Sequence, residues 1–142
     1  MAQINFFCQD VSFKLPRPGK TRLWIAEAIR RERSHLVQLN YIFCTDEYLF
    51  TINRQYLRHT ALTDIITFDN SDAPGAIEGD IFISLPRVMA NAKKFRADDL
   101  EELHRVLIHG VLHLIGYSDK SVRQKAQMRK KEDAYLSLRG EL

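Results

Sequence analysis

The chain has 142 residues, a formal net charge of +3 and a sequence pI of about 8.9. Hydrophobic residues make up 45% and charged residues 27%, which is ordinary for a globular protein and argues against disorder. The two cysteines, Cys8 and Cys44, lie far apart, which argues against a disulfide framework or a thiolate zinc knuckle. We expect one domain, residues 1–142, with its own hydrophobic core.

The expected compartment is a reducing cytoplasm. No segment approaches the roughly 20 apolar residues that cross a bilayer, so no membrane association is expected. The opening MAQINFFCQD lacks a basic region followed by a long apolar core, so no signal peptide is expected. The mildly basic charge permits an anionic partner without establishing one.

The first part of the chain predicts a strand, a helix and a second strand. Residues 2–7 are rich in β-forming side chains, and the Pro and Gly residues at 16–20 mark a turn. Thr21 can cap a helix that continues to about Arg33, along which apolar residues recur at helical spacing. Residues 35–44 alternate in part between apolar and polar side chains, as a strand does.

The middle of the chain predicts a second helix and a β-hairpin. Thr45 and Asp46 open the helix, in which apolar residues again recur at helical spacing. A β-branched strand at 63–69 is followed by a long polar turn and a returning strand at 79–84. We expect these two strands to pair antiparallel.

Three further helices complete the chain. Ser84 caps the first and Pro86 starts it, and the helix continues to about Phe95. An apolar helix with two histidines follows, and a last helix runs from about Ser121 to Leu138. This order predicts an α+β fold, with a small mixed sheet of about four strands and helices packed on one face.

The histidine helix carries the strongest motif, because Val106 to Asp119 reads VLIHGVLHLIGYSD. His109 and His113 are four residues apart, so both imidazoles lie on one helical face and can reach one ion. Gly116 can adopt the left-handed conformation, end the helix and bring Asp119 back toward the histidines. Three protein ligands with an open fourth position are typical of a catalytic, zincin-like zinc site.

Two alternatives to this metal site stay open. A histidine on an apolar helix is usually a hydrogen-bonded core residue, although two unpaired imidazoles in such a run are costly to bury. Asp119 could cap a helix that begins around Ser118 instead of binding metal. One zinc ion per chain is expected, but imidazole and carboxylate also suit nickel, iron and manganese.

A zinc site of this kind predicts hydrolysis, because zinc lowers the pKa of its bound water to about 7. Zinc proteases with an H-E-x-x-H helix use the Glu as general base, and Gly110 stands at that position here. A zinc peptidase is therefore the less favoured interpretation. Phosphodiester hydrolysis needs a positioned nucleophile and nearby cations, and this chain offers such cations.

Basic residues follow the metal motif, with no acidic residue between Lys120 and Lys131. They could bind a phosphate backbone, or they could form an ordinary solvated helix face. Arg58, after the second helix, is a further candidate on the same terms. The predicted nucleic-acid ligands are Arg54, Lys120, Arg123, Lys125 and Arg129.

Two carboxylates at strand starts, Asp64 and Asp80, could each orient a ligand imidazole through its second nitrogen. The alternative is that each caps a turn.

Together these residues resemble the YbeY family of bacterial endoribonucleases, the rRNA maturation factors. The family helix reads His-Gly-x-Leu-His-Leu-x-Gly-Tyr-Asp-His, and its first nine positions fit residues 109–117. Ser118 stands where the family usually has Asp, and Asp119 stands where it has a third His. TDIITF, GDIFISLPR and the N-R-x-Y segment at 53–56 also look like family elements, so the resemblance spans about residues 41–135.

The resemblance implies a zinc-dependent, single-strand-directed endoribonuclease in small-subunit rRNA 3′-end maturation and ribosome quality control. Zinc would be held by His109, His113 and Asp119, and the two histidines and Arg58 would be catalytic. The implied partners are rRNA and the small ribosomal subunit, with ribosomal proteins or a ribosome-associated GTPase as further candidates.

Two departures from the family pattern favour an alternative, a non-catalytic ribosome-assembly factor with a structural metal. The carboxylate of Asp119 is an acceptable zinc ligand, but its added negative charge makes the ion a weaker Lewis acid. The family also tends to place an Arg directly after the tyrosine of its N-x-x-Y segment. Here Leu57 occupies that position, and Arg58 follows one residue late.

Overall fold

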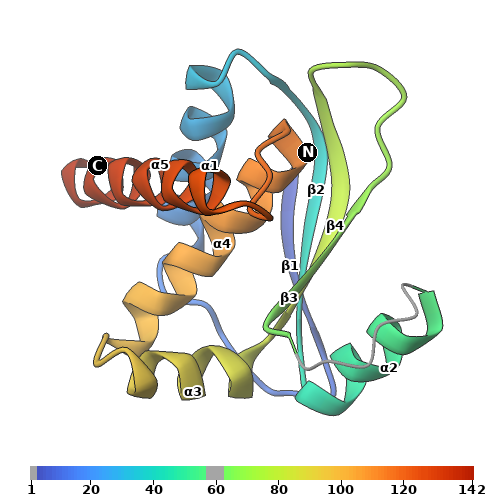
Figure 1. Cartoon of the computed structure of the whole chain (residues 1–142). Helices are drawn as coiled ribbons and strands as arrows, with labels where there is room; N and C mark the ends of the chain where they lie inside the picture. Colours follow the sequence, from blue (N-terminus) through green and yellow to red (C-terminus); the bar gives the residue numbers. More distant parts are fainter. Residues whose placement is uncertain (1–2, 57–62) are drawn as a thin grey trace.

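The computed structural model describes residues 3–56 and 63–142. In this part of the chain a four-stranded sheet and five helices form the α+β fold that was predicted (Figure 1). The elements in chain order are β1 (Ile4–Gln9), α1 (Pro18–Arg31), β2 (His35–Cys44), α2 (Asp46–Tyr56), β3 (Ile65–Asp69), β4 (Ala76–Ser84), α3 (Leu85–Lys94), α4 (Asp99–Ile115) and α5 (Val122–Glu141).

The sheet is mixed, with strand order β1-β2-β4-β3. β1 and β4 both run parallel to β2, and β3 runs antiparallel to β4, which confirms the predicted hairpin. β4 begins at Ala76, three residues earlier than expected, because Ala76 and Ile77 pair with His35 and Leu36 of β2. The polar turn of the hairpin is correspondingly shorter.

Helices cover one face of the sheet, as predicted, except for α2. Figure 1 shows α1, α4 and α5 on one side of the strands and α2 on the other. Alternating side chains of the hairpin explain this division, since Ile81 and Ile83 join the main core while Ile66 packs with Leu49 of α2. The second face of the sheet therefore has a small core of its own.

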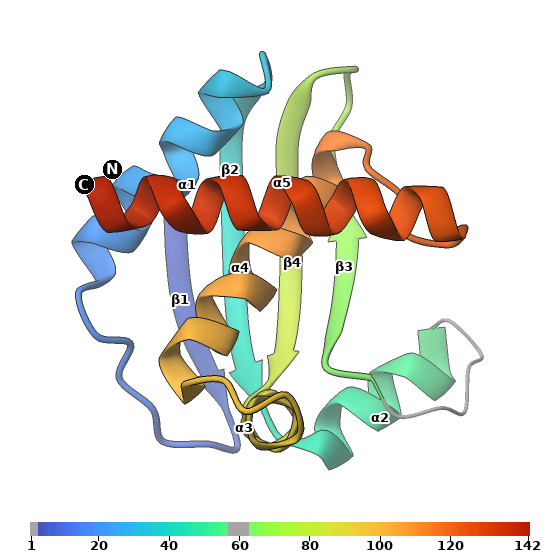
Figure 2. The same cartoon turned by 60° about the vertical axis from the view of Figure 1, so that its left-hand side comes forward.

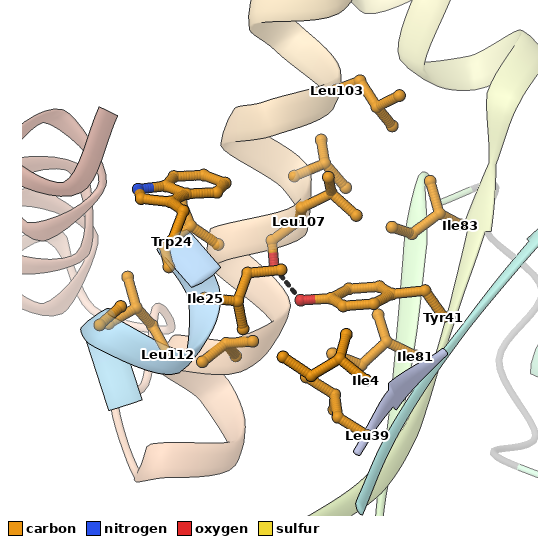
Figure 3. Packing of buried hydrophobic residues seen from close by; sticks show 14 of the residues in the cluster. Ile4, Trp24, Ile25, Leu39, Tyr41, Ile81, Ile83, Leu103, Leu107 and Leu112 are labelled. Atoms are coloured by element: carbon orange, nitrogen blue, oxygen red, sulfur yellow. Dashed lines mark hydrogen bonds between the residues drawn. The ribbon is translucent and has the colours of Figure 1, made fainter. Parts of the chain in front are cut away.

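The main core lies between the sheet and helices α1 and α4 (Figure 3). Its largest side chains are fully buried, and their polar atoms are paired. Tyr41 donates its hydroxyl proton to the Leu107 carbonyl oxygen at 2.8 Å, and Trp24 donates Nε1–H to the Tyr135 carbonyl oxygen at 2.7 Å. These bonds fix α4 and α5 against the sheet and α1.

The start of α1 differs from the prediction. Thr21 is not the cap: the helix begins at Pro18, and the N-cap residue Arg17 is left-handed without a side-chain cap. Pro suits the first helical turn because its missing N–H needs no partner there. Thr21 is instead buried, and its hydroxyl accepts a hydrogen bond from Nη2 of Arg139 at 3.1 Å.

The predicted cap of α3 is confirmed, because Ser84 accepts a hydrogen bond from the Arg87 N–H at 3.3 Å. Among the helices within residues 3–56 and 63–142, none is both long and apolar enough to cross a membrane.

Candidate metal centre

Helix α4 places both histidines on one side of the molecule. Its N-cap, Asp98, accepts hydrogen bonds from the N–H groups of Leu100 and Glu101, at 3.0 and 3.3 Å. The opposite side of the helix is buried against the sheet. The rings of His109 and His113 consequently lie side by side, with their centroids 4.5 Å apart.

Gly110 has a structural role that the sequence alone did not reveal. A Cβ atom at this position would lie 2.9 Å from Cδ1 of Ile65 and 3.0 Å from Cδ1 of Ile81. The helix therefore approaches the sheet more closely than a larger residue permits. The residue at the position of a protease base thus serves to seat α4 on β3 and β4.

The turn after α4 brings the third predicted ligand back to the histidines. Gly116 has φ 129°, and its N–H donates to the carbonyl oxygens of Leu112 and His113. Oδ2 of Asp119 consequently lies 3.4 Å from Nε2 of His109 and 3.4 Å from Nε2 of His113. One ligand atom from each of these three residues can be chosen so that all lie within 4.8 Å of one another.

Asp119 does not cap the last helix. The N-cap of α5 is Ser121, whose hydroxyl accepts a hydrogen bond from the Gln124 N–H at 3.0 Å. The Gln124 side chain accepts in return from the Ser121 N–H, which completes a capping box. The alternative in which Asp119 serves only as a cap is therefore wrong.

The second nitrogen of each histidine has its own acceptor. Nδ1 of His109 lies 2.6 Å from Oε2 of Glu132, and Nδ1 of His113 lies 3.0 Å from the carbonyl oxygen of Tyr117. An acceptor at Nδ1 places the ring proton there and leaves the lone pair on Nε2. When the rings are neutral, both Nε2 atoms therefore point their lone pairs toward Asp119.

The prediction that Asp64 or Asp80 orients an imidazole is wrong. Asp80 accepts hydrogen bonds from Asn40 and Asn70, at 3.0 and 3.4 Å, within and beside the sheet. Asp64 lies near the site, but its carboxylate accepts from Asn91 at 3.4 Å. A position at the start of a strand does not determine which carboxylate faces the histidine rings.

Glu132 of α5 takes the role expected of Asp64 or Asp80. Its side chain is only 6% exposed, and Nη1 of Arg105 donates to it at 2.8 Å. The sequence carried one signal for it, because the buried residues Met128, Glu132 and Tyr135 recur at helical spacing. An acidic residue on that face needs a buried partner, which only the crossing of α5 over α4 identifies.

The histidines differ in their electrostatic surroundings. Burial by itself lowers the pKa of His109, but the hydrogen bond and charge of Glu132, with the charges of Asp119 and Asp64, raise that pKa above its usual value. Burial and the neighbouring His109 lower the pKa of His113. Burial raises the pKa of Asp64. Negative charge thus gathers around His109, as it does around a bound cation.

The donor set fits a zinc ion. Ligand atoms at roughly 2.0–2.1 Å from a tetrahedral zinc are roughly 3.3 Å from one another, and both observed separations between histidine Nε2 and Asp119 Oδ2 are 3.4 Å. The three side chains are 20%, 26% and 39% exposed, so one side of the group is open to solvent. Three ligands with an open side correspond to a catalytic rather than a structural site.

A cavity of about 270 Å³ adjoins this group. Its lining includes Asp64, Arg105, His109, Asp119, Arg129 and Glu132.

Of the five cations predicted to bind nucleic acid, all within the described residues, Arg129 is the one that lines this cavity. Lys120, Arg123 and Lys125 are exposed on the turn before α5 and on its first turns, and Arg54 is exposed on α2. Arg58 and its neighbour Leu57 lie outside the described residues.

The comparisons with known proteins agree with this geometry. A family model described as Endoribonuclease YbeY matches residues 10–140. The Endoribonuclease YbeY of Cytophaga hutchinsonii is 52% identical over 136 residues, which cover 96% of this chain and 95% of that protein. The Endoribonuclease YbeY of Amoebophilus asiaticus is 46% identical over 135 residues, which cover 95% and 92%.

The fold is also similar to a solved structure. The solution structure of TM1509 from Thermotoga maritima matches with a TM-score of 0.70 and 26% identity, and the match covers 97% of this chain and 90% of that one. The similarity therefore extends over nearly the whole chain, beyond residues 41–135, which carry the family motifs.

Proposed function

The chain belongs to the endoribonuclease YbeY family and is an RNA hydrolase, and we propose that its reaction depends on one zinc ion held by His109, His113 and Asp119. We further propose that it cleaves single-stranded rRNA, in maturation of the small-subunit rRNA 3′ end and in ribosome quality control. It would act in the cytoplasm, with the small ribosomal subunit, ribosomal proteins or a ribosome-associated GTPase as partners.

The observation that supports the metal is the convergence of the three ligand atoms. Oδ2 of Asp119 lies 3.4 Å from Nε2 of each histidine, and each Nδ1 atom has its own acceptor. Without a cation, the Asp119 carboxylate and the Nε2 lone pair of His113, whose pKa is lowered by burial and by His109, would face each other in a half-buried pocket, which is unfavourable. A divalent ion removes that conflict.

A zinc ion held there would lower the pKa of its water and polarise a phosphoryl oxygen, and both effects would favour phosphodiester hydrolysis near neutral pH. The protein's own groups do the rest. Glu132 and the Tyr117 carbonyl oxygen hold the two imidazole rings in their ligating orientation. These bonds confine both Nε2 atoms before any substrate arrives.

Two further side chains of the cavity have roles in the same proposal. Arg129 makes no ion pair within the described residues, so its guanidinium can neutralise the non-bridging phosphate oxygens. Asp64 lies in the cavity with a pKa raised by burial, so its carboxylate can accept the proton of the attacking water. The attack forms a P–O bond to water oxygen and breaks the bond to the leaving ribose oxygen, which can take the proton that Asp64 accepted.

The test compares wild type with Asp119→Ala and, as a matched control, Asp72→Ala, an exposed aspartate of the β3–β4 turn. We expect about one zinc per chain by elemental analysis in wild type and in the control, and a large loss in Asp119→Ala. Cleavage of single-stranded rRNA fragments should fall with the zinc content. Zinc retained by Asp119→Ala would remove Asp119 from the ligand set.

The alternative of a non-catalytic assembly factor has a distinct signature. Zinc-loaded protein would bind rRNA or the small subunit and leave the RNA intact. Cleavage of casein by the same preparation would instead identify a peptidase, which Gly110 disfavours because no base stands at that position.

A further inference from the structure

A second cavity, of about 580 Å³, lies between the first half of α4 and the second half of α5. Three residues, Glu102, Arg105 and Arg129, line both this cavity and the metal cavity. Figure 2 shows that α5 crosses over α4, and residues of both helices line each of the two cavities. A strand of RNA with its cleaved linkage at the metal would therefore bring a neighbouring nucleotide to the second cavity.

A buried histidine in this second cavity lacks a partner. His104 is 7% exposed, and its Nε2 atom has no hydrogen-bond partner among the described residues. Its ring lies edge-on to Trp24, with centroids 5.9 Å apart. A buried polar atom without a partner is costly, and such atoms often mark a site where a ligand supplies the missing bond. A neutral imidazole has one donor and one acceptor nitrogen.

The charges of the second cavity suit a base better than a phosphate group. Three arginines line it, but so do three carboxylates, and Arg105 is already paired with Glu132 and Asp133. A phosphate would be repelled by the acidic groups. The edge of a nucleobase carries donors and acceptors side by side, and it can bond to carboxylate, guanidinium and imidazole together. The carboxylates are Asp98, Glu101 and Glu102.

Apolar side chains at the same cavity offer surfaces for the faces of a base. Leu100 and Leu136 line it, and so does Phe95, which is 61% exposed. Unpaired RNA bases bind by stacking on such aromatic rings while their edges form hydrogen bonds. A large aromatic side chain left in solvent beside a polar cavity fits this mode.

We propose that the cavity between α4 and α5 binds one nucleobase of the RNA, from a nucleotide that flanks the cleaved linkage. Phe95 stacks on the base, and His104 bonds to its edge. This inference rests on the proposed function for its substrate. Binding of the base in this cavity makes the enzyme selective for RNA in which that base is unpaired. Cleavage confined to single strands follows, because a paired base cannot present both its face and its edge.

The first test uses a single-stranded RNA oligonucleotide that wild type cleaves at one linkage, and a series in which one flanking nucleotide at a time lacks its base. We expect one position at which loss of the base lowers kcat/KM about tenfold or more, the size of a lost stacking contact. Phe95→Ala and His104→Gln should cleave the intact oligonucleotide more slowly than wild type does. In these two variants, loss of the base should no longer lower kcat/KM.

The matched control is Phe7→Ala, which truncates a 52% exposed phenylalanine of β1 outside both cavities and should keep the wild-type sensitivity. Phe95 is itself largely exposed, so its truncation leaves the core intact even if His104→Gln unfolds. The proposal is overturned if no abasic position affects wild type, or if Phe95→Ala retains full sensitivity.

The second test does not require cleavage. Trp24, the only tryptophan of the sequence, touches His104, so its fluorescence reports on the cavity. Adenosine, guanosine, cytidine and uridine 5′-monophosphates are titrated into zinc-loaded protein, with ribose 5-phosphate as the probe that lacks a base. At least one nucleotide should give a saturable change that is lost in His104→Gln. An equal response to ribose 5-phosphate, or no response to any nucleotide, overturns the proposal.

The two tests also separate this inference from the proposed function. If zinc-loaded wild type cleaves no RNA, the proposed function fails while the nucleotide titration still decides whether the cavity binds a base.

Discussion

Oε2 of Glu132 lies 2.6 Å from Nδ1 of His109, so a residue of the last helix orients a proposed metal ligand on the central helix. The same carboxylate is bonded to Arg105 at 2.8 Å through its other oxygen. Both oxygens are thus occupied, and the imidazole cannot turn without breaking a short bond in a buried place.

Replacing Glu132 by Gln should lower the zinc affinity by about 10- to 100-fold, the usual effect of removing the partner of a ligating histidine. The amide cannot supply the negative charge that holds the Nδ1 proton in place. Competition with a chromogenic chelator measures the affinity. Asp133→Asn is the control, because it breaks the other ion pair of Arg105 at 2.7 Å without touching His109. Equal losses in both variants would mean that the effect passes through Arg105.

Replacing Tyr117 by Phe should also weaken zinc binding, by about tenfold at most. The Tyr117 hydroxyl donates to Oε1 of Glu32 at 2.6 Å, and its carbonyl oxygen is the acceptor for His113. Removing the hydroxyl frees the turn that carries Asp119. Tyr135→Phe is the control, because that hydroxyl donates to the same Glu32 from α5, outside the turn that carries Asp119. Zinc affinities that fall alike would contradict this account.

Replacing Gly110 by Ala should destabilise the protein by about 1–3 kcal/mol, as overpacking of a core usually does. The added Cβ would press on Ile65 and Ile81, which hold α4 close to the sheet. Gly19→Ala, in a helix with nothing within 4 Å of the new atom, should be neutral or slightly stabilising. Urea unfolding of the two variants measures the difference. Equal stability of both would show that the sheet can move aside.

Stability should fall below pH 6.5 because of His104. Burial lowers its pKa to about 4, with further lowering by the charges of Arg139 and Lys20 and a smaller opposing effect of Asp98. The unfolded chain binds a proton on His104 below about pH 6.5, whereas the folded protein binds it only near pH 4. His104 therefore costs no folding free energy above pH 6.5, and the free energy of unfolding falls as the pH is lowered from 6.5 to about 4. A shift of this size corresponds to roughly 3 kcal/mol.

The measurement is the free energy of unfolding at pH 7.5 and 4.5, in wild type, His104→Gln and the control His35→Gln, an exposed histidine at the start of β2. Carboxylates titrate over the same range, so the informative quantity is the change between variants. His104→Gln should lose less stability on acidification than the other two. Parallel losses in all three proteins would exclude His104 as the source.

The sequence predicts the relative positions of those site residues that depend on local geometry. The spacing of His109 and His113 and the turn at Gly116 lie within one helix and its end, so helical geometry alone brings Asp119 toward them. The hairpin of β3 and β4 is equally local. Zinc binding by the three residues remains a prediction.

The parts that could not be predicted depend on how distant elements pack. Glu132 is close to His109 only because α5 crosses α4, and no short-range pattern encodes that crossing. The position of α2 on the second face depends on Leu49 packing with Ile66, which is 17 residues away in the sequence. Thr is a favoured cap residue, which predicts a cap at Thr21, but the Thr21 hydroxyl accepts a hydrogen bond from Arg139 of the last helix instead.

The last helix has a small buried face, formed by Met128, Glu132, Tyr135 and Leu138. One of these four residues is the carboxylate that holds His109, a proposed zinc ligand, so the proposal predicts that the docking of α5 and the binding of zinc are thermodynamically linked. Removing the metal should increase hydrogen exchange along α5, although no zinc ligand lies in that helix. A chain that ends before Glu132 would keep all three proposed ligands and should still bind zinc weakly.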